Sequence, residues 1–351
     1  MTISYAVVTA SDVAYFSYIY SIIPMENYQR ATGYLRSAVL FGYTFGAGLG
    51  QILISLAGLD YFHINAITLG VVSVAFLLSF WLPKPKRSMF FKGRKAVALG
   101  QKSQQTRPVG AADETVSDAG SGKRKMEHND STGCYICRHL IYWSLWWALA
   151  TAGYTQIMNY IQLMWDHIEP SATSSVYNGG VEAACSLVGA AAALSVSHIK
   201  VNWTVWGELA LGVFSAIGAG AVFLTALTSN IWACYAGYAL FKSCYMLLIT
   251  VTTFQIAANL SLECYALTFG INTFVALVLQ TVMTLIFVDE ATLGVDIETQ
   301  FIIYGSYHAA ISALFMIRGV YTVCATPSSP GPSDMEKERD DTAEVIYAES
   351  F

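Results

Sequence analysis

The chain has 351 residues, of which 55% are apolar and only 12% are charged. Soluble domains carry about 25% charged residues, so this composition excludes an ordinary soluble globular protein. The net charge of −5 comes mostly from an acidic C-terminal segment and indicates little about partners. Long uncharged runs recur instead, and about 20 apolar helical residues are enough to cross a membrane. Because a membrane barrel would show shorter, alternating segments, the sequence predicts an all-α membrane protein.

Nine apolar spans follow one another, with a polar segment after the third. They cover 4–23, 31–58, 62–82, 139–165, 174–198, 204–227, 231–258, 264–288 and 299–322. Residues 1–82 therefore predict a partial N-terminal bundle of three helices, and residues 139–323 predict a C-terminal bundle of six. Residues 83–138 have almost no aliphatic clusters and predict a disordered loop, while residues 324–351 predict a disordered acidic tail.

Basic residues lie almost entirely on one side of these spans. Between Lys200 and Arg318 the only Lys or Arg is Lys242, whereas basic residues crowd 84–95, directly after the third span. Short cytoplasmic loops of membrane proteins retain Lys and Arg. We therefore expect the 83–138 loop and the tail in the cytoplasm and residue 1 on the opposite side of the membrane.

Three ionisable side chains fall deep inside the predicted spans. Counted at about 1.5 Å per residue from the helix ends, Asp12, Glu182 and Lys242 all lie near the midplane. A charge there costs about 2.5 kcal/mol or more, so each residue needs a partner or a function. Two interpretations stay open. One is a buried cation site in which Glu182 and Asp12 supply the negative charge, and the other is a structural ion pair, such as Glu182 with Lys242, that joins two helices.

A polar stripe marks one face of the fourth span. Its hydrogen-bonding side chains recur at i, i+4, i+8 and i+11, and they are Thr151, Thr155, Asn159 and Gln162. Such a stripe lines a cavity or grips a neighbouring helix, and we favour the cavity. The eighth span repeats the pattern more sparsely with Asn272 and Gln280.

The second span carries a ridge of small residues at Gly42, Gly46 and Gly50. Such ridges are typical of closely packed membrane helices. Tyr43 beside the ridge has two open interpretations, because its ring can stack on a flat ligand or pack in the core.

The sequence carries none of the common catalytic motifs. The chain has no phosphate loop, no dinucleotide fingerprint and no metal-spaced His cluster, and Cys134-x-x-Cys137 has no second pair for zinc. We therefore expect no enzyme activity, no metal, no cofactor and no nucleic-acid partner. Without a nucleotide-binding loop, transport driven directly by ATP within this chain is also excluded.

Long stretches of the chain resemble the reduced folate and thiamine carrier family, solute carrier family 19. The stretches are YQRATGYLRSAVL (28–40), LPKPKRSMFF (82–91), YWSLWWALATAG (142–153), VYNGGVEA (176–183), NIWACYAGY (230–238), FKSCYMLLIT (241–250) and FGINTFVAL (269–277). The resemblance covers essentially every span. It implies a major facilitator superfamily-like bundle of twelve helices, six plus six, of which about three would precede the spans seen here.

The resemblance also implies a function and a site. It implies transport of thiamine across the plasma membrane by alternating access, with no cofactor. Residues similar to those lining the family's thiamine site are Tyr5, Tyr43, Asn159 and Glu182, but Thr2 stands where the family has an acidic residue. With the polar residues found above, the candidate substrate-binding set is Tyr5, Asp12, Tyr43, Asn159, Gln162, Glu182 and Gln280. Lys242 would serve as a structural or coupling ion pair.

Charge at two positions separates thiamine from folate as the expected substrate. Folate carriers, as the resemblance implies, have Arg where this chain has Asp12 and Lys where it has Gln280. Thiamine is a cation and folates are dianions, so loss of two positive charges in a poorly screened site favours the cation. Two alternatives stay open. The chain is a truncated, non-transporting isoform that associates with or regulates the full-length carrier, or it is a reduced folate transporter.

Overall fold

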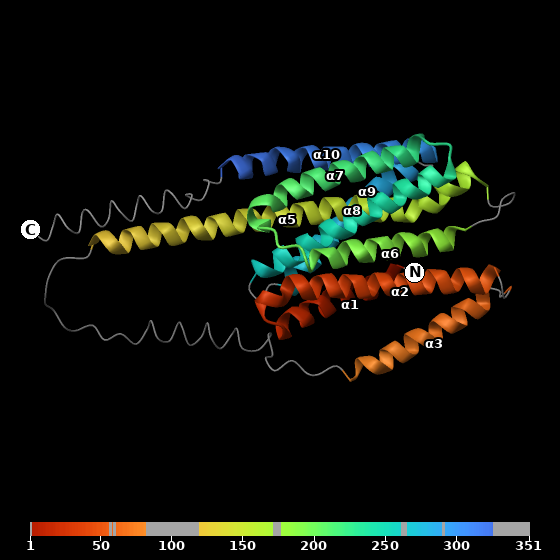
Figure 1. Cartoon of the computed structure of the whole chain (residues 1–351), viewed down its shortest axis with the longest axis horizontal. Coiled ribbons are helices and arrows are strands. Elements are labelled where there is room, and N and C mark those ends of the chain that lie inside the picture. Colours follow the sequence, from red (N-terminus) through yellow and green to blue (C-terminus); the bar gives the residue numbers. More distant parts are fainter. Residues whose placement is uncertain are drawn as a thin grey trace, which may run out of the picture.

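A computed structural model describes residues 2–55, 58, 61–81, 119–170, 177–260, 265–289 and 292–325. Side chains are described from Ala10 onward, apart from those of Tyr61, residues 119–139 and Thr204. All regular structure within these ranges is helical, which confirms the predicted all-α class (Figure 1).

Each of the nine predicted spans coincides with one long helix. The helices are α1 (Thr2–Ile22), α2 (Tyr28–Ser55), α3 (Tyr61–Ser79), α5 (Ala119–Ile168), α6 (Asn178–Val196), α7 (Trp203–Leu227), α8 (Ile231–Ala258), α9 (Tyr265–Met283) and α10 (Ile297–Ala325). A short 3₁₀ turn, η1 (Met25–Asn27), precedes α2, and a π-helical turn, η3 (Thr284–Val288), continues α9. Seven helices in the described ranges are long and apolar enough to cross a membrane, the exceptions being α1 and α5.

Helix α5 begins earlier than the sequence predicts. It starts at Ala119 rather than near 139, so the end of the expected loop 83–138 is helical (Figure 1). A helix that is already nucleated in the membrane extends at little cost, because each added residue forms one more backbone hydrogen bond. Residues 82–118 and 326–351, which cover most of the predicted loop and tail, lie outside the described ranges.

Side-chain caps explain where two helices begin. The Asn230 side chain accepts a hydrogen bond from the Trp232 amide at 2.9 Å at the start of α8. At the start of α10, the Asp296 carboxylate accepts bonds from the Thr299 amide at 3.0 Å and the Thr299 hydroxyl at 2.8 Å. Those hydrogen bonds lower the pKa of Asp296, because they favour the ionised carboxylate. Both residues satisfy amides that a helix start leaves free.

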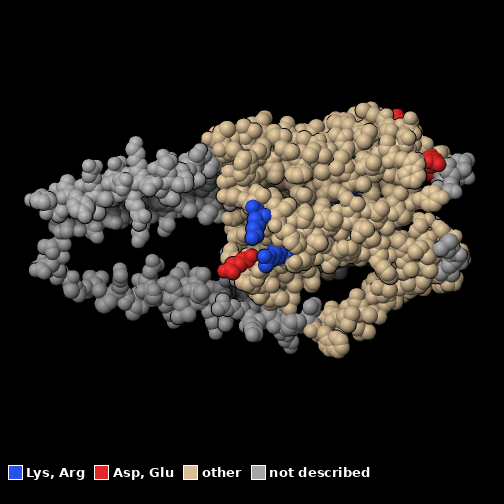
Figure 2. All heavy atoms as spheres, viewed as in Figure 1, with Lys and Arg blue, Asp and Glu red and all other residues tan. Residues whose placement is uncertain are grey.

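The helices run side by side along the long axis of the molecule (Figure 1). The most extensive contacts join α7 to α10 and α2 to α6, with α8 packed against both α6 and α7. Helix α3 stands apart at one edge, and no residue of its apolar stretch is buried (Figure 1). On the face seen in Figure 2, the visible Lys and Arg side chains lie at one end of the helices only, whereas acidic side chains lie at both ends.

Two hydrophobic clusters follow each other along the bundle. One contains residues of α1 and α2 together with the C-terminal helices, including Tyr20, Tyr28 and Leu40. The other is built only from α5 to α10, around residues such as Trp165 and Phe301. Helices α1 and α2 therefore join the core of the C-terminal bundle mainly at the end that carries η1.

Helices α7 and α10 approach each other backbone to backbone. A Cβ atom added at Gly212 would come within 2.6 Å of the Met316 amide nitrogen, and one at Gly319 would collide with Leu209. The Ser312 hydroxyl also donates to the Gly212 carbonyl at 2.9 Å. Only glycine permits this distance, so the two helices form one tightly packed unit.

An ion pair fastens the same two helices at the end where α10 finishes. The Arg318 Nε atom lies 3.3 Å from the Glu208 carboxylate, which is buried. Thr322 donates to the same carboxylate at 2.5 Å, and the ring of Tyr142 lies 4.3 Å from the guanidinium. The buried carboxylate thus depends on groups supplied by α10.

The glycine ridge of α2 has no close neighbour in the described residues. Cβ atoms added at Gly42, Gly46 and Gly50 would meet nothing within 4 Å. None of the described helices therefore packs closely on these three glycines.

Replacing Arg318 by Ala should destabilise the protein markedly. The change leaves Glu208 buried without its counter-ion, and removing one partner of a buried pair costs about 3 kcal/mol or more. Scanning fluorimetry in detergent should show a clear drop in melting temperature, and Arg30→Ala, at an exposed position, should not. Equal melting temperatures for both variants would contradict this account of the ion pair.

Candidate functional site

A cavity of about 190 Å³ lies where α1 and α2 meet the C-terminal helices. Its polar lining consists of Asp12, Arg36, Thr151, Tyr245, Thr253 and Thr273. Its apolar lining consists of Val13, Phe16, Trp147, Ile249 and Phe269. Five different helices therefore contribute, and the cavity holds one acidic and one basic residue beside three threonine hydroxyls.

The predicted candidate Asp12 lines this cavity. The opposite charge comes from Arg36, which was not among the predicted site residues. Arg36 donates to the Thr253 hydroxyl at 3.3 Å and places its guanidinium 5.1 Å from the Phe16 ring centre. The signal was available, because Arg36 is a charged residue inside an apolar span and such residues are functional candidates by default. Trp147, Tyr245 and Phe269 were also missed, since aromatic residues in spans are usually core.

Buried tyrosines connect α1, α2 and α9 next to the cavity lining. The Tyr28 hydroxyl donates to the Tyr20 carbonyl at 3.0 Å and lies 3.0 Å from the Tyr265 hydroxyl. The Tyr20 hydroxyl shares a 2.5 Å hydrogen bond with Thr32. The Tyr265 ring packs on Phe269, which lines the cavity. Helix α2 is therefore hydrogen-bonded to α9, and α1 contacts α9 through the Tyr20 and Tyr265 rings, toward the end that the basic residues assign to the cytoplasm.

Lys242 and Glu182 form an ion pair between α8 and α6. Lys242 is 2% exposed, and its ammonium donates to the Glu182 carboxylate and, at 2.9 Å, to the Ser186 hydroxyl. Tyr238 donates to the same carboxylate at 2.9 Å. Of the two interpretations left open by the sequence, the geometry matches the structural pair directly, and Glu182 does not line the cavity that contains Asp12.

A stack of tyrosines lies between the ion pair and the cavity. The rings of Tyr154 and Tyr245 are parallel to within 7° and their centres are 3.8 Å apart. Tyr245 lines the cavity and shares a 3.0 Å hydrogen bond with Thr151. Arg36 of α2 lines the same cavity as Tyr245 of α8. Side chains from both halves of the chain therefore contribute to the wall on which this stack borders.

The other predicted site residues occupy different positions. Asn159 and Gln162 are exposed on α5 and do not line the cavity, although Thr151 of the same stripe does. The Tyr43 side chain is 65% exposed, and Gln280 is half-buried on α9. Asn272 is buried and donates to Ser144 at 3.2 Å, which grips α5 rather than lining the cavity. Tyr5 lies on α1, but its side chain is outside those described.

The arrangement favours reversible binding of a small ligand rather than catalysis. Asp12 attracts a cation, Arg36 limits the net charge, and the hydroxyls and aromatic rings offer hydrogen bonds and flat surfaces. A polar cavity between two groups of membrane helices is the usual setting of a substrate site in a secondary transporter. Fold and site together define an all-α, multi-pass membrane carrier.

The chain belongs to the reduced folate carrier family, whose model matches residues 1–303. The family expected from the sequence is thereby confirmed, and with it the major facilitator-like class of fold. The family and the relatives that match are carriers by name, not enzymes.

Individual relatives cover most of the chain. The chain is 48% identical over 366 aligned residues to thiamine transporter 2 of Macaca fascicularis. That alignment covers 94% of this chain and 74% of the relative. The chain is 44% identical over 348 residues to thiamine transporter 1 of Homo sapiens, with coverage of 91% and 70%. The reduced folate transporter of Homo sapiens is 34% identical over 330 residues, with coverage of 90% and 55%.

Substituting Lys242 alone should lower the yield of folded protein. Lys242→Met leaves the Glu182 carboxylate without its counter-ion, at a cost of about 3–5 kcal/mol. The double variant Glu182→Gln with Lys242→Met leaves no unpaired charge and should restore most of the folded fraction. Size-exclusion profiles and melting temperatures of detergent-solubilised protein measure both effects. A single variant as stable as the unmodified chain would show that the pair does not hold α6 to α8.

Proposed function

We propose that this chain carries thiamine across a membrane by alternating access. The observation that carries the proposal is the difference in sequence identity. The chain is 48% and 44% identical to proteins named thiamine transporters and 34% identical to a reduced folate transporter. Asp12 in the cavity supports it, because a carboxylate in a poorly hydrated site attracts a cation and repels a dianion. A folate carrier is accordingly the less supported alternative.

In this mechanism the thiazolium cation of thiamine binds near Asp12. The Trp147 and Phe269 rings offer faces for a flat or cationic ring, and the Thr151 and Thr273 hydroxyls offer hydrogen bonds to the aminopyrimidine. Glu182 stays paired with Lys242 and holds α6 to α8 while the substrate binds beside them. Arg36 keeps the cavity from accumulating negative charge, which permits release as well as binding.

Movement of the helices would complete the cycle. A cavity of about 190 Å³ is smaller than the roughly 300 Å³ at which pockets for drug-sized ligands begin, so loading requires α1 and α2 to separate from the C-terminal helices. The Tyr20, Tyr28 and Tyr265 contacts are the ones that must break for release on their side. Tyr43, Asn159 and Gln162 are exposed, and we propose them, with Tyr5 and Gln280, as residues that substrate meets along the route.

Removing the charge of Asp12 should weaken thiamine binding selectively. Asp12→Asn keeps the size of the side chain, so we expect KM for labelled thiamine to rise about tenfold, or 1.4 kcal/mol, with surface abundance unchanged. Uptake into cells that express the chain measures this effect. The matched control is Glu26→Gln, an exposed acid outside the cavity, which should leave KM unchanged.

Two results would count against the proposal. One is no thiamine uptake above mock-transfected cells when surface delivery is normal. The other is an Asp12→Asn variant with unaltered KM for thiamine. Biotinylation at the cell surface, needed for both comparisons, also tests the proposed location in the plasma membrane.

A second candidate is a non-transporting chain that associates with a full-length carrier. The observation that favours it is the unpacked face of α2 and α3, where the glycine ridge is open and the apolar side chains of α3 are exposed. Co-purification of the tagged chain with a differently tagged full-length relative, at matched expression, would support this candidate. Uptake by the chain expressed alone would argue against it.

A further inference from the structure

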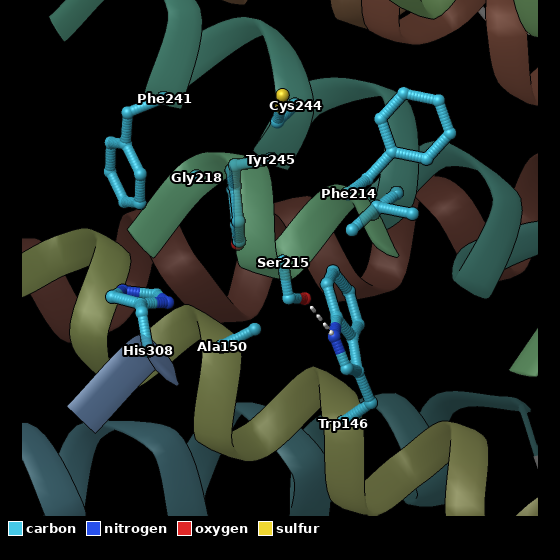
Figure 3. A pocket seen from close by; sticks show the side chains of 10 residues that line it. Trp146, Ala150, Phe214, Ser215, Gly218, Phe241, Cys244, Tyr245 and His308 are labelled. Atoms are coloured by element: carbon cyan, nitrogen blue, oxygen red, sulfur yellow. Dashed lines mark hydrogen bonds between the residues drawn. The ribbon is translucent and has the colours of Figure 1, made fainter. Parts of the chain in front are cut away.

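A second, much smaller hollow lies inside the C-terminal bundle, between α5, α7, α8 and α10. Its volume is about 10 Å³, which is the space of roughly one water molecule. The polar groups around it are those of Trp146, Ser215, Cys244, Tyr245 and His308. Figure 3 shows the imidazole of His308 on one side of the hollow and the Trp146–Ser215 pair on the other. All five side chains are buried.

His308 lines this hollow and has a polar atom without a hydrogen-bond partner. The residue is 4% exposed, and its Nε2 atom lies beside Gly153 of α5, where an added Cβ atom would come within 2.5 Å of it. Among the described residues, the Nε2 atom nevertheless has no hydrogen-bond partner of acceptable geometry. A buried polar atom left unsatisfied is destabilising, so the site favours a guest that can donate or accept a hydrogen bond.

Ser215 offers the complementary half of such a site. Its hydroxyl oxygen accepts a hydrogen bond from the Trp146 indole at 3.1 Å (Figure 3). That bond occupies the oxygen and leaves the hydroxyl proton able to donate to a guest. Cys244 and Tyr245 complete the polar wall, and a buried water typically has two to four such partners.

We propose that one ordered water molecule binds in this hollow and connects His308 on α10 with Ser215 on α7. The hollow is too small for a larger guest, and water satisfies the imidazole whichever of its nitrogens carries the proton. The water therefore belongs to the folded structure of the C-terminal bundle.

Tyr245 gives this water a connection to the larger cavity. Among the described lining residues it is the one that the two spaces share, and its hydroxyl shares the 3.0 Å hydrogen bond with Thr151. A water against one side of Tyr245 fixes the position of that ring and hydroxyl at the cavity wall. His308 is thus a positioning residue for Tyr245, a step that rests on the proposed function.

Hydroxyl-radical footprinting of the full chain in nanodiscs tests the water site without any substrate. X-ray pulses generate radicals from bound water, so side chains beside it are oxidised although they are buried. Cys244 and Trp146 should be oxidised at least about tenfold faster than Cys234, a buried cysteine on the same helix that lines neither cavity. Equal rates for Cys244 and Cys234 in the unmodified chain would overturn the proposal.

Variants at His308 separate a water site from a merely loose core. His308→Leu removes the polar partner at similar size and should bring the oxidation of Cys244 to the level of Cys234, whereas His308→Gln should keep it fast. Melting temperatures confirm that each variant is folded. Fast oxidation of Cys244 in His308→Leu would overturn the assignment of His308 as a ligand of the water.

The positioning role has its own readout. With the footprint established, His308→Leu should raise KM for thiamine several-fold at unchanged maximal rate, and His308→Gln should restore it. An unaltered KM in His308→Leu would remove the role of His308 in placing Tyr245. An absence of thiamine uptake in the unmodified chain would instead count against the proposed function and leave the footprinting result intact.

Discussion

The ammonium group of Lys242 is the charge around which the C-terminal bundle is organised. It is buried on α8, and in a medium that poorly stabilises lone charges it requires a counter-ion close by. Glu182, Ser186 and Tyr238 meet that requirement and thereby tie α6 to α8. Glu182 is thus engaged by Lys242, whereas Asp12 is the acidic residue that lines the cavity described above.

Charge balance also shapes the cavity that holds Asp12. Arg36 lines the same space, so α1 and α2 each contribute one ionisable side chain, of opposite sign, to the cavity lining. In the proposed mechanism, a cation bound there would gain the attraction of Asp12 and would also meet the repulsion of Arg36. Opposing charges in one cavity would keep binding moderate enough for release, and the hydroxyls and aromatic rings would distinguish one cation from another.

The sequence predicted properties that depend on local chemistry. The positions of the helices follow from apolar length, and the Glu182–Lys242 contact was one of two interpretations that the cost of buried charge allowed. Properties that depend on helix rotation could not be predicted in this way. Thr151 lines the larger cavity, while Asn159 and Gln162 on the same stripe are exposed. Tyr245 lines both the larger cavity and the small hollow, and this position depends on how the helices pack. The roles assigned to individual site residues stay predictions.

The close backbone contacts of Gly212 on α7 with α10, and of Gly319 on α10 with α7, leave little room for the two helices to slide past each other. Because the two helices are in such close contact, we expect α7 and α10 to move as one rigid body in any rearrangement of this bundle. Hinges must then lie in the connections to α6, α8 and α9. Spectroscopic labels on α7 and α10 would accordingly keep a constant separation through the working cycle and provide an internal ruler for the motion of every other helix.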